Sequence, residues 1–223
     1  MSTTDLSIFG GKTAMPAHLM QNTADAQLGN EHGGAEDTAI PVLNLLQALS
    51  PQVADSTVDG AKAGLFHNSI TDDLYPTVNV INLSFSRDYA VFRKQNRGGG
   101  YHGSFETQAD AQAKVAELGG NADDYDIFET AKHVVLLLDE AGQPVQPMLI
   151  RLKSTGIQVS KTWNAAIQTE GQGAARFATV WRLEAEKKSK NGNTWYVMKP
   201  GFLGWAPEAL YEEAKKFYEA TKG

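Results

Sequence analysis

The stretch around which the fold is organised runs from Val78 to Phe105 and reads VNVINLSFSRDYAVFRKQNRGGGYHGSF. In Val78–Ser86, apolar and small polar residues alternate with one irregularity at Ile81, which predicts a β-strand. Cationic and aromatic side chains follow and continue beyond a triple glycine: Arg87, Tyr89, Phe92, Arg93, Lys94, Arg97 and Tyr101. Such a mixture suits a single-stranded nucleic acid, which is a polyanion with exposed flat bases. The alternative is a hairpin whose rings belong to the core and whose charges face solvent.

The charge of the chain is unevenly distributed. The formal net charge is −6, which on its own speaks against binding a polyanion. Residues 1–77 and 106–143 each carry nine acids and two bases, whereas residues 78–105 carry four bases and one acid, and residues 144–199 nine bases and three acids. Because the local field governs polyanion binding, the two basic blocks are candidates for a nucleic-acid surface. We expect the acidic blocks to lie outside the β-rich part of the fold that carries the basic ones.

Two parts of the chain differ in composition. Residues 1–38 are rich in Ala, Gly, Thr, Asn and Gln with only isolated large apolar residues, so they cannot bury enough surface to offset the entropy of ordering. We expect a flexible N-terminal segment there and a single domain over residues 39–223. The first strongly apolar run, Ile40–Leu49, lies between two prolines. It predicts a short helix or apolar plug that caps a sheet, or else a self-association face.

The remaining elements follow from their periodicity. Glu106–Leu118 predicts a helix that Thr107 caps and that ends at Gly119. His133–Asp139 and Val145–Lys153 predict two strands, the first of them buried on both faces. A helix is expected from Ser154 or Thr155 to about Gln168, followed by two strands around the turn Asn191–Asn193. A C-terminal amphipathic helix is expected at about 207–221, with an apolar stripe of Leu210, Tyr211, Ala214, Phe217 and Tyr218.

This order of elements predicts an α+β, β-rich fold of the OB type. An OB barrel has five strands, with a helix inserted between the third and the fourth. The helix near Thr155–Gln168 takes that place if two early segments form one bent strand. We therefore expect an OB-like antiparallel barrel or sheet with an inserted helix. In its fourth strand, Phe177 and Trp181 should belong to the core, with Arg176 and Arg182 facing outward.

Enzymatic and metal-dependent functions find little support. The chain has no cysteine, so disulfides and cysteine-based zinc sites or nucleophiles are excluded. The five histidines show no metal-ligand spacing, and the motifs HExxH, GxSxG and the nucleotide-fold glycine fingerprint are absent. Phe9–Thr13 is similar to the end of a P-loop, but Leu6 stands where its first glycine is needed. We expect no catalytic residues, no metal site and no cofactor.

Four short stretches carry a resemblance to a known family, namely Ile40–Pro51, Gly60–Gly64, Arg97–Gly103 and Lys153–Asn164. Over about residues 38–220, the chain resembles a family of small bacteriophage proteins, some of which look like replication-associated single-stranded DNA-binding proteins. The resemblance implies binding of single-stranded DNA and contact with replication proteins. Proteins of that class commonly end in an acidic recruiting tail, whereas Phe217–Gly223 holds one acid, Glu219, so we do not expect recruitment of that kind.

The leading hypothesis is a non-specific, non-catalytic single-stranded DNA-binding protein of phage replication or recombination, acting in the cytoplasm of the host cell. No apolar run is long enough to span a membrane. Phosphates would be neutralised by Arg87, Arg93, Lys94, Arg97, Arg151, Lys153, Arg182, Lys187 and Lys188, and bases would stack on Tyr89, Phe92, Tyr101 and Trp195. The competing hypotheses are a virion or assembly protein that forms homo-oligomers, and an inhibitor of a host nucleic-acid enzyme whose acidic blocks mimic DNA.

Overall fold

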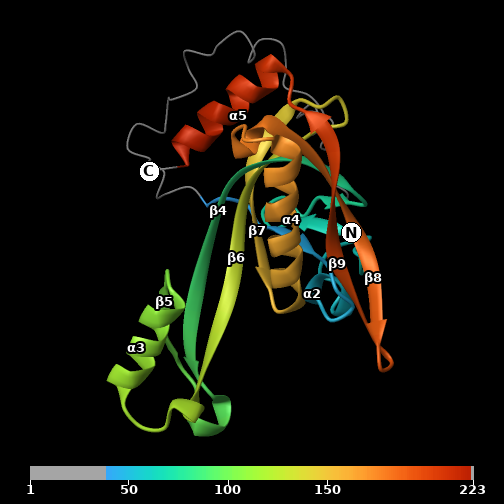
Figure 1. The fold of residues 1–223 in the computed structure, drawn as a ribbon. Coiled ribbons are helices and arrows are strands. Elements are labelled where there is room, and N and C mark those ends of the chain that lie inside the picture. Colours follow the sequence, from blue (N-terminus) through green and yellow to red (C-terminus); the bar gives the residue numbers. More distant parts are fainter. Residues whose placement is uncertain (1–38, 222–223) are drawn as a thin grey trace, which may run out of the picture. The chain divides into compact units, whose positions relative to one another are not determined.

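The computed structural model describes residues 39–221, and the chain divides into two units, Met1–Ala39 and Ile40–Gly223. The expected flexible segment 1–38 lies outside the described residues. The second unit contains all the helices and strands of the described residues (Figure 1).

A six-stranded antiparallel sheet forms the centre of this unit. Five of its strands follow the order β7-β6-β4-β8-β9, and a short sixth strand, β5, pairs with the outer part of β4. The bounds are β4 (Val78–Arg93), β5 (Tyr101–Phe105), β6 (Tyr125–Leu138), β7 (Pro144–Lys153), β8 (Thr179–Lys190) and β9 (Asn193–Trp205). β6 is therefore hydrogen-bonded on both sides, as the continuous apolar run in its second half predicts.

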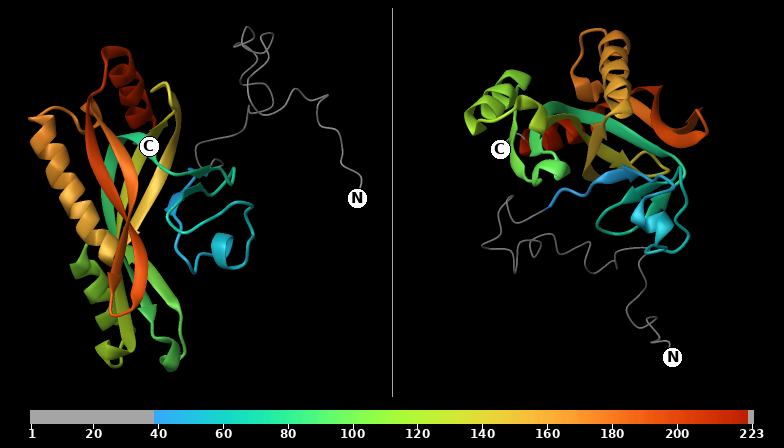
Figure 2. Two further views of the ribbon diagram at one scale, coloured as in Figure 1. Left: turned by 90° about the vertical axis from the view of Figure 1, so that its right-hand side faces the viewer. Right: turned by 90° about the horizontal axis from the view of Figure 1, so that it is seen from below.

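Two helices cover the two faces of this sheet. α4 (Thr155–Gly171) buries Trp163 against one face, in a cluster with Val80, Val135 and Trp181. α5 (Glu208–Ala220) covers the other face, where Ala214 is buried. The predicted apolar stripe of α5 is confirmed, because its other four members pack against the same cluster. Figures 1 and 2 show α4 in orange and α5 in red as two separate helices packed on the sheet.

The predicted β-rich α+β fold, with an antiparallel sheet and an inserted helix, is confirmed. β4, β6 and β7 form a meander, α4 follows the third strand, and β8 returns to pair with β4. Phe177 lies in the short 3₁₀ helix η6 (Arg176–Ala178), and both Phe177 and Trp181 are buried as predicted. Arg182 is exposed, but the outward position expected for Arg176 is wrong: its guanidinium donates to Asn82 Oδ1 inside the fold, at 3.2 Å.

The sheet does not close into a barrel. In an OB barrel the third and fifth strands would pair, but β7 and β9 lie at the two ends of the strand order. A second sheet lies at this open seam, formed by β1 (Leu43–Leu45), β2 (Phe66–Asn68) and β3 (Leu74–Tyr75). Next to its strand β1, Val42 forms an isolated parallel bridge with Leu149 of β7. The side chain of Gln47 then bonds both backbone groups of Tyr196 on β9, at 2.8 and 3.0 Å.

The apolar run Ile40–Leu49 therefore contains the short strand β1, and it bridges the seam instead of forming a helix or a simple plug. Its helical neighbour, α2 (Pro51–Ala54), is only four residues long and buries none of them. Leu43 and Phe66 of the small sheet enter the same core cluster as Trp163 and Trp181. The expected role in covering the main sheet is thus carried out by a strand pair.

The outer halves of β4 and β6 extend beyond this body as an arm, which we define as residues 84–132. A register shift between Asn82 and Ser84 marks where the arm begins. Besides β5, it contains η4 (Gln95–Arg97), α3 (Gln108–Leu118) and η5 (Ala122–Asp124). α3 begins and ends where the sequence predicts: Thr107 Oγ1 accepts from Asp110 N at 3.1 Å, and Gly119 follows the last turn.

The arm has a small core of its own. Val91, Ala111 and Val115 are buried together, with Tyr89, Phe105 and Ile127 packed around them. The triple glycine forms the turn between η4 and β5, and all three residues have positive φ angles, of 101°, 66° and 125°. Residues with a side chain rarely adopt such angles, which explains why three glycines stand here.

Candidate nucleic-acid interface

Three aromatic rings form an exposed face on the arm. Phe92 and Tyr101 are direct partners across β4 and β5, with ring centroids 5.3 Å apart. Phe128 of β6 is the third member, 5.8 Å from Phe92 and edge-on to it. The three residues are 38%, 60% and 50% exposed, so their rings remain open to a ligand. We call Phe92, Tyr101 and Phe128 the aromatic face.

The pleat of the strands explains why these rings are exposed. Side chains at alternate positions point to opposite sides of a sheet. Val91 and Ile127 are cross-strand partners that face α3 and its small core. Phe92 and Phe128, each one residue further along, therefore point to the side that α3 leaves uncovered. Tyr89, two residues before Val91, points to the same side of the sheet as Val91 and packs into the core of the arm. The structure therefore does not place it with Phe92 and Tyr101, the other predicted stacking residues of the arm.

Phe128 is a functional candidate that sequence reasoning missed. It belongs to the acidic block, and nothing within Tyr125–Leu138 marks it as a neighbour of the Val78–Phe105 stretch. Only the register of β4 against β6, with Ala90 opposite Phe128, brings it beside Phe92. One signal in the sequence could have identified it. If the predicted strand is extended back to residue 125, alternation along the strand puts Ile127 and Phe128 on opposite faces of the sheet, with one ring exposed.

Ion pairs neutralise most of the arm's basic residues. Arg87 pairs with Glu129 at 3.1 Å, Arg97 with Asp124 at 3.1 Å, and Lys94 with Asp126 at 3.7 Å. Lys132 pairs with Asp88 in the same way. The expectation that the acidic block lies outside the β portion is wrong, because Asp126 and Glu129 belong to β6, which is the direct neighbour of β4. The arm carries eight acids and six bases, so it is an aromatic surface more than a basic one.

Arg93 is the exception among the predicted cations of the arm. It is exposed at the end of β4, opposite Tyr125, and it takes part in no ion pair within residues 39–221. Because Arg93 is two residues after Val91, its side chain points to the same side of the sheet, which is the side that α3 covers.

A second pair of predicted cations continues the aromatic face towards the body of the sheet. Arg151 and Lys153 of β7 lie opposite Lys132 and Thr130 of β6. Both are exposed, and neither forms an ion pair in the described part of the chain. Lys132 has the same parity as Phe128 and follows it by four residues, a distance of about 13 Å along a strand. The rings, Lys132 and the Arg151–Lys153 pair thus lie along one side of the sheet and together form what we call the strip. Buried Thr130 and its cross-strand neighbour Asp88, which pairs with Lys132, lie between the rings and Lys132.

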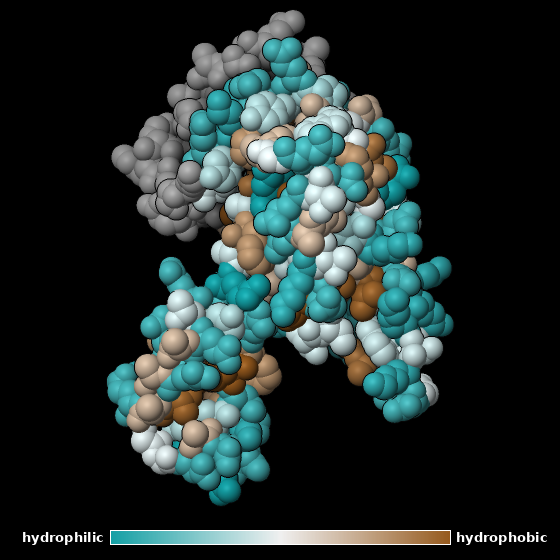
Figure 3. All heavy atoms as spheres, viewed as in Figure 1, coloured by the Kyte–Doolittle hydropathy of each residue, from teal (hydrophilic) through white to brown (hydrophobic). Residues whose placement is uncertain are grey.

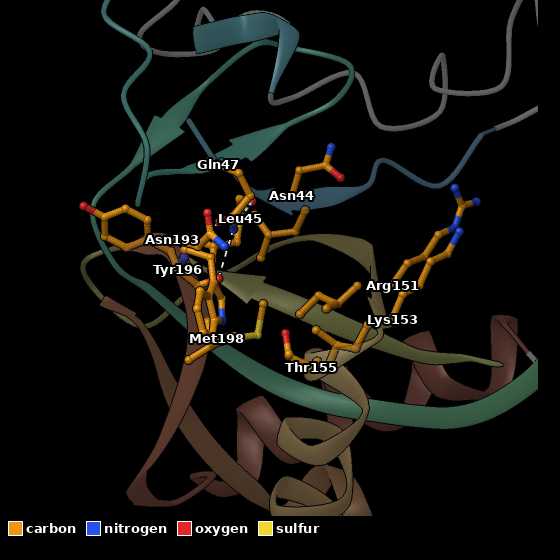
Figure 4. Close-up of a pocket in the computed structure, with 15 residues that line it drawn as sticks. Asn44, Leu45, Gln47, Arg151, Lys153, Thr155, Asn193, Tyr196 and Met198 are labelled. Carbon is orange, nitrogen blue, oxygen red and sulfur yellow. Dashed lines mark hydrogen bonds between the residues drawn. The ribbon is translucent and has the colours of Figure 1, made fainter. Parts of the chain in front are cut away.

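The strip ends at a pocket of about 610 Å³ in the open seam between β7 and β9 (Figure 4). Arg151, Lys153 and Trp195, three residues predicted to bind nucleic acid, all line it. Figure 4 shows Arg151 and Lys153 on the opposite side of the pocket from Tyr196. The remaining lining residues are Leu43, Asn44, Leu45, Gln47, Ile150, Leu152, Thr155, Gly156, Asn193, Tyr196, Val197 and Met198.

The other predicted cations lie on β8. Lys188 is the cross-strand partner of Trp195, but it is paired with Glu186 at 2.8 Å, and its hydrogen bond lowers the pKa of that carboxyl group. Arg182 donates to Asn79 Oδ1 at 3.2 Å, and Lys187 is exposed. The arm and the end of the β8–β9 hairpin both extend to the lower side of Figure 1, and Figure 3 shows open space between them.

A buried polar chain beneath α4 has the appearance of a catalytic triad. His133 Nε2 lies 2.8 Å from Ser160 Oγ, and His133 Nδ1 lies 3.0 Å from Asn82 Nδ2. All three residues are buried. Because Arg176 donates to the amide oxygen of Asn82, the amide nitrogen donates to Nδ1, and Nε2 must carry the proton. Nε2 therefore cannot accept a proton from Ser160, and the hydrogen bonds that join Asn82, His133 and Ser160 hold these side chains in place beneath α4.

Burial, reinforced by the charge of Arg176, lowers the pKa of His133 to about 3. The imidazole is therefore neutral at physiological pH, as its hydrogen-bond pattern requires. Within residues 39–221, no three His, Asp or Glu side chains are grouped as metal ligands. No helix in that range has the length and apolarity needed to cross a bilayer.

Comparison with known proteins identifies a phage family. No curated protein and no solved structure matches the chain. The family described as Pam3 phage gp34-like protein matches residues 9–223, which is nearly the whole chain. The chain is therefore a member of the Pam3 phage gp34-like protein family.

Proposed function

We propose that this phage protein binds single-stranded DNA without sequence specificity and without catalysis, in the replication or recombination of phage DNA. The observation that carries the proposal is the strip formed by the aromatic face, Lys132 and the Arg151–Lys153 pair. Rings exposed on a sheet can stack with any base, because every base has a flat π-face. The cations at the end of the strip are free to meet phosphates.

The topology supports the same function. In OB folds, oligonucleotides bind across the second and third strands and contact the loops that join strands one and two and strands four and five. Here those strands are β6 and β7, the first connection is the arm, and the second is the β8–β9 hairpin. The strip runs along the arm and across β6 to β7, which is the corresponding surface.

The charge of the arm determines how such binding should respond to salt. Each neutralised phosphate contributes about −0.7 to the slope of log K against log salt for a single strand. Arg151 and Lys153 are candidates for such contacts, whereas the paired arginines and lysine of the arm, and Arg93 on the α3 side, are not. We expect a slope of about −1.4, which is shallow for a nucleic-acid-binding protein, with stacking as the main source of affinity.

The test is a titration of a labelled 20-residue oligothymidine by fluorescence anisotropy at two salt concentrations, with a duplex of equal length as competitor. The expected result is binding of the single strand, weak competition by the duplex and a shallow salt slope. Absence of binding at low salt contradicts the proposal. A slope of −5 or steeper would show that phosphate contacts dominate and would contradict the role of the rings.

Self-association is a second candidate function, favoured by one observation. Phe202, Leu203 and Trp205 are exposed large side chains near the end of β9, and β9 is an edge strand of the main sheet. An exposed apolar edge strand is a ready surface for pairing with another chain. Light scattering of the wild type and of Trp205→Ser over a range of protein concentrations tests it. A monomer at every concentration eliminates this candidate.

A further inference from the structure

We propose that the seam pocket holds one nucleotide of the bound strand, with its phosphate on Arg151 and Lys153 and its base against the wall formed by Trp195. The inference rests on the proposed function and names the part of the site that takes an unstacked nucleotide.

The position of the pocket follows from the incomplete barrel. β1 stays with β7 only as far as the bridge at Leu149 and then reaches across to β9, where Gln47 bonds Tyr196. Between these two points no ladder joins β7 to β9, which leaves the space of about 610 Å³. Pockets for small ligands usually have volumes of about 300–1,000 Å³, so a single nucleotide fits in this one.

One side of the pocket suits an anion. Arg151 and Lys153 are exposed, and no carboxylate is among the lining residues. Thr155 and Gly156, the first two residues of the 17-residue helix α4, also line the pocket. Ser154 makes no side-chain bond to cap this helix. The two cations are the anchors for a phosphate, and the positive end of the helix dipole adds to their field.

The other side suits a flat, partly polar ring. Leu45, Val197 and Met198 supply apolar surface, and Trp195 supplies an aromatic ring. The Trp195 Nε1 atom is buried within the protein without a hydrogen-bond partner in the described structure, so this residue offers a base its ring surface and not its N–H group. Asn44 and Asn193 offer further amide groups, whereas Gln47 already uses its amide on Tyr196. A carbonyl-bearing base on an apolar wall, next to a phosphate on two cations, satisfies both sides of the pocket.

The experiment measures binding of thymidine monophosphate, thymidine and the 20-residue oligothymidine to the full chain by isothermal titration calorimetry. For the monophosphate we expect a Kd below about 1 mM and affinity at least about tenfold higher than for thymidine. The double variant R151A/K153A should lose that preference for the phosphate. Lys161→Ala, which removes an exposed cation of α4 outside the pocket, should retain it. Circular dichroism melting checks that each variant is folded.

The outcomes separate the pocket from the general function. If the oligonucleotide binds but the monophosphate does not, the pocket assignment is overturned while DNA binding stands. If the monophosphate binds but the oligonucleotide does not, DNA binding fails and the pocket is a mononucleotide site. Equal affinity of R151A/K153A and wild type for the monophosphate also overturns the inference, as does equal affinity of the wild type for monophosphate and thymidine.

Discussion

Two aromatic clusters of the main sheet differ in one respect: whether a helix covers them. On the body of the sheet, Trp163 of α4 stacks on His133 of β6 at 4.8 Å and meets Trp181 of β8 edge-on at 6.3 Å, all of them buried. On the arm, Phe92 meets Tyr101 and Phe128 at similar distances, but the rings are exposed. α4 covers the first cluster, whereas α3 packs on the opposite side of the arm.

This difference assigns the two clusters different roles. Rings covered by a helix contribute apolar burial, and their removal leaves a cavity. Rings left open contribute little to folding and keep their surface for a ligand. Substitutions in the first cluster should therefore change stability, and substitutions in the second should change binding.

The largest effect is expected from Trp163→Ala. Removing a large buried aromatic side chain typically costs about 3–5 kcal/mol of unfolding free energy, and Trp163 is 1% exposed. Chemical denaturation followed by circular dichroism measures it, with Trp163→Phe as a milder control. A loss below about 1 kcal/mol would show that the cluster under α4 is not the core of this unit.

The next effect concerns the open cluster. Phe92→Ala and Phe128→Ala should each reduce affinity for oligothymidine by about 1–3 kcal/mol, the usual contribution of a stacking ring. Their unfolding free energies should change by less than about 1 kcal/mol, because the rings are exposed. Anisotropy and denaturation of the same preparations give both values. Loss of stability with unchanged affinity would reverse the roles of the two clusters.

The covered cluster should also respond to acid. The pKa of His133 is about 3 in the folded protein and about 6.5 when unfolded, so the unfolded state binds the additional proton between these values. Stability is then complete above pH 6.5 and falls below it, by up to about 1.4 kcal/mol per pH unit. Unfolding at pH 7.5 and pH 5 should show a loss of about 2 kcal/mol from this residue. His133→Gln should show a smaller loss, and an identical pH profile would exclude His133 as the cause.

The smallest effect separates paired from free cations. Arg97 is bound to Asp124 on the surface of the arm, and such exposed pairs contribute about 0–1 kcal/mol. Arg97→Ala should leave the salt slope of DNA binding nearly unchanged, whereas Arg151→Ala should reduce its magnitude by about 0.7. The measurement is the anisotropy titration over a series of salt concentrations. A larger change for Arg97 than for Arg151 would place the phosphate contacts on the arm.

Local patterns in the sequence were enough to predict much of the fold. The limits of α3, the position of α4, the apolar stripe of α5 and the buried face of Trp181 all follow from capping residues and periodicity. These features depend on residues that are neighbours along the chain. The order of elements was likewise enough to predict a β-rich α+β fold with an antiparallel sheet.

Long-range register accounts for what the sequence did not show. The ion pairs of Arg87, Lys94 and Arg97 exist because β6 brings acids from a distant block alongside β4. Phe128 joins Phe92 for the same reason. The open seam depends on β1 reaching across from β7 to β9, and no local pattern in Ile40–Leu49 indicates those partners.

Photo-cross-linking tests most directly the claim that the uncovered aromatic face is the DNA-binding surface. An oligonucleotide containing 5-iodouracil is bound to the full chain and irradiated, and the modified residues are identified by mass spectrometry. We expect adducts on Phe92, Tyr101 or Phe128. Adducts confined to other surfaces, such as Phe202 and Trp205 on β9, with the aromatic face unmodified in a saturated complex, would contradict it.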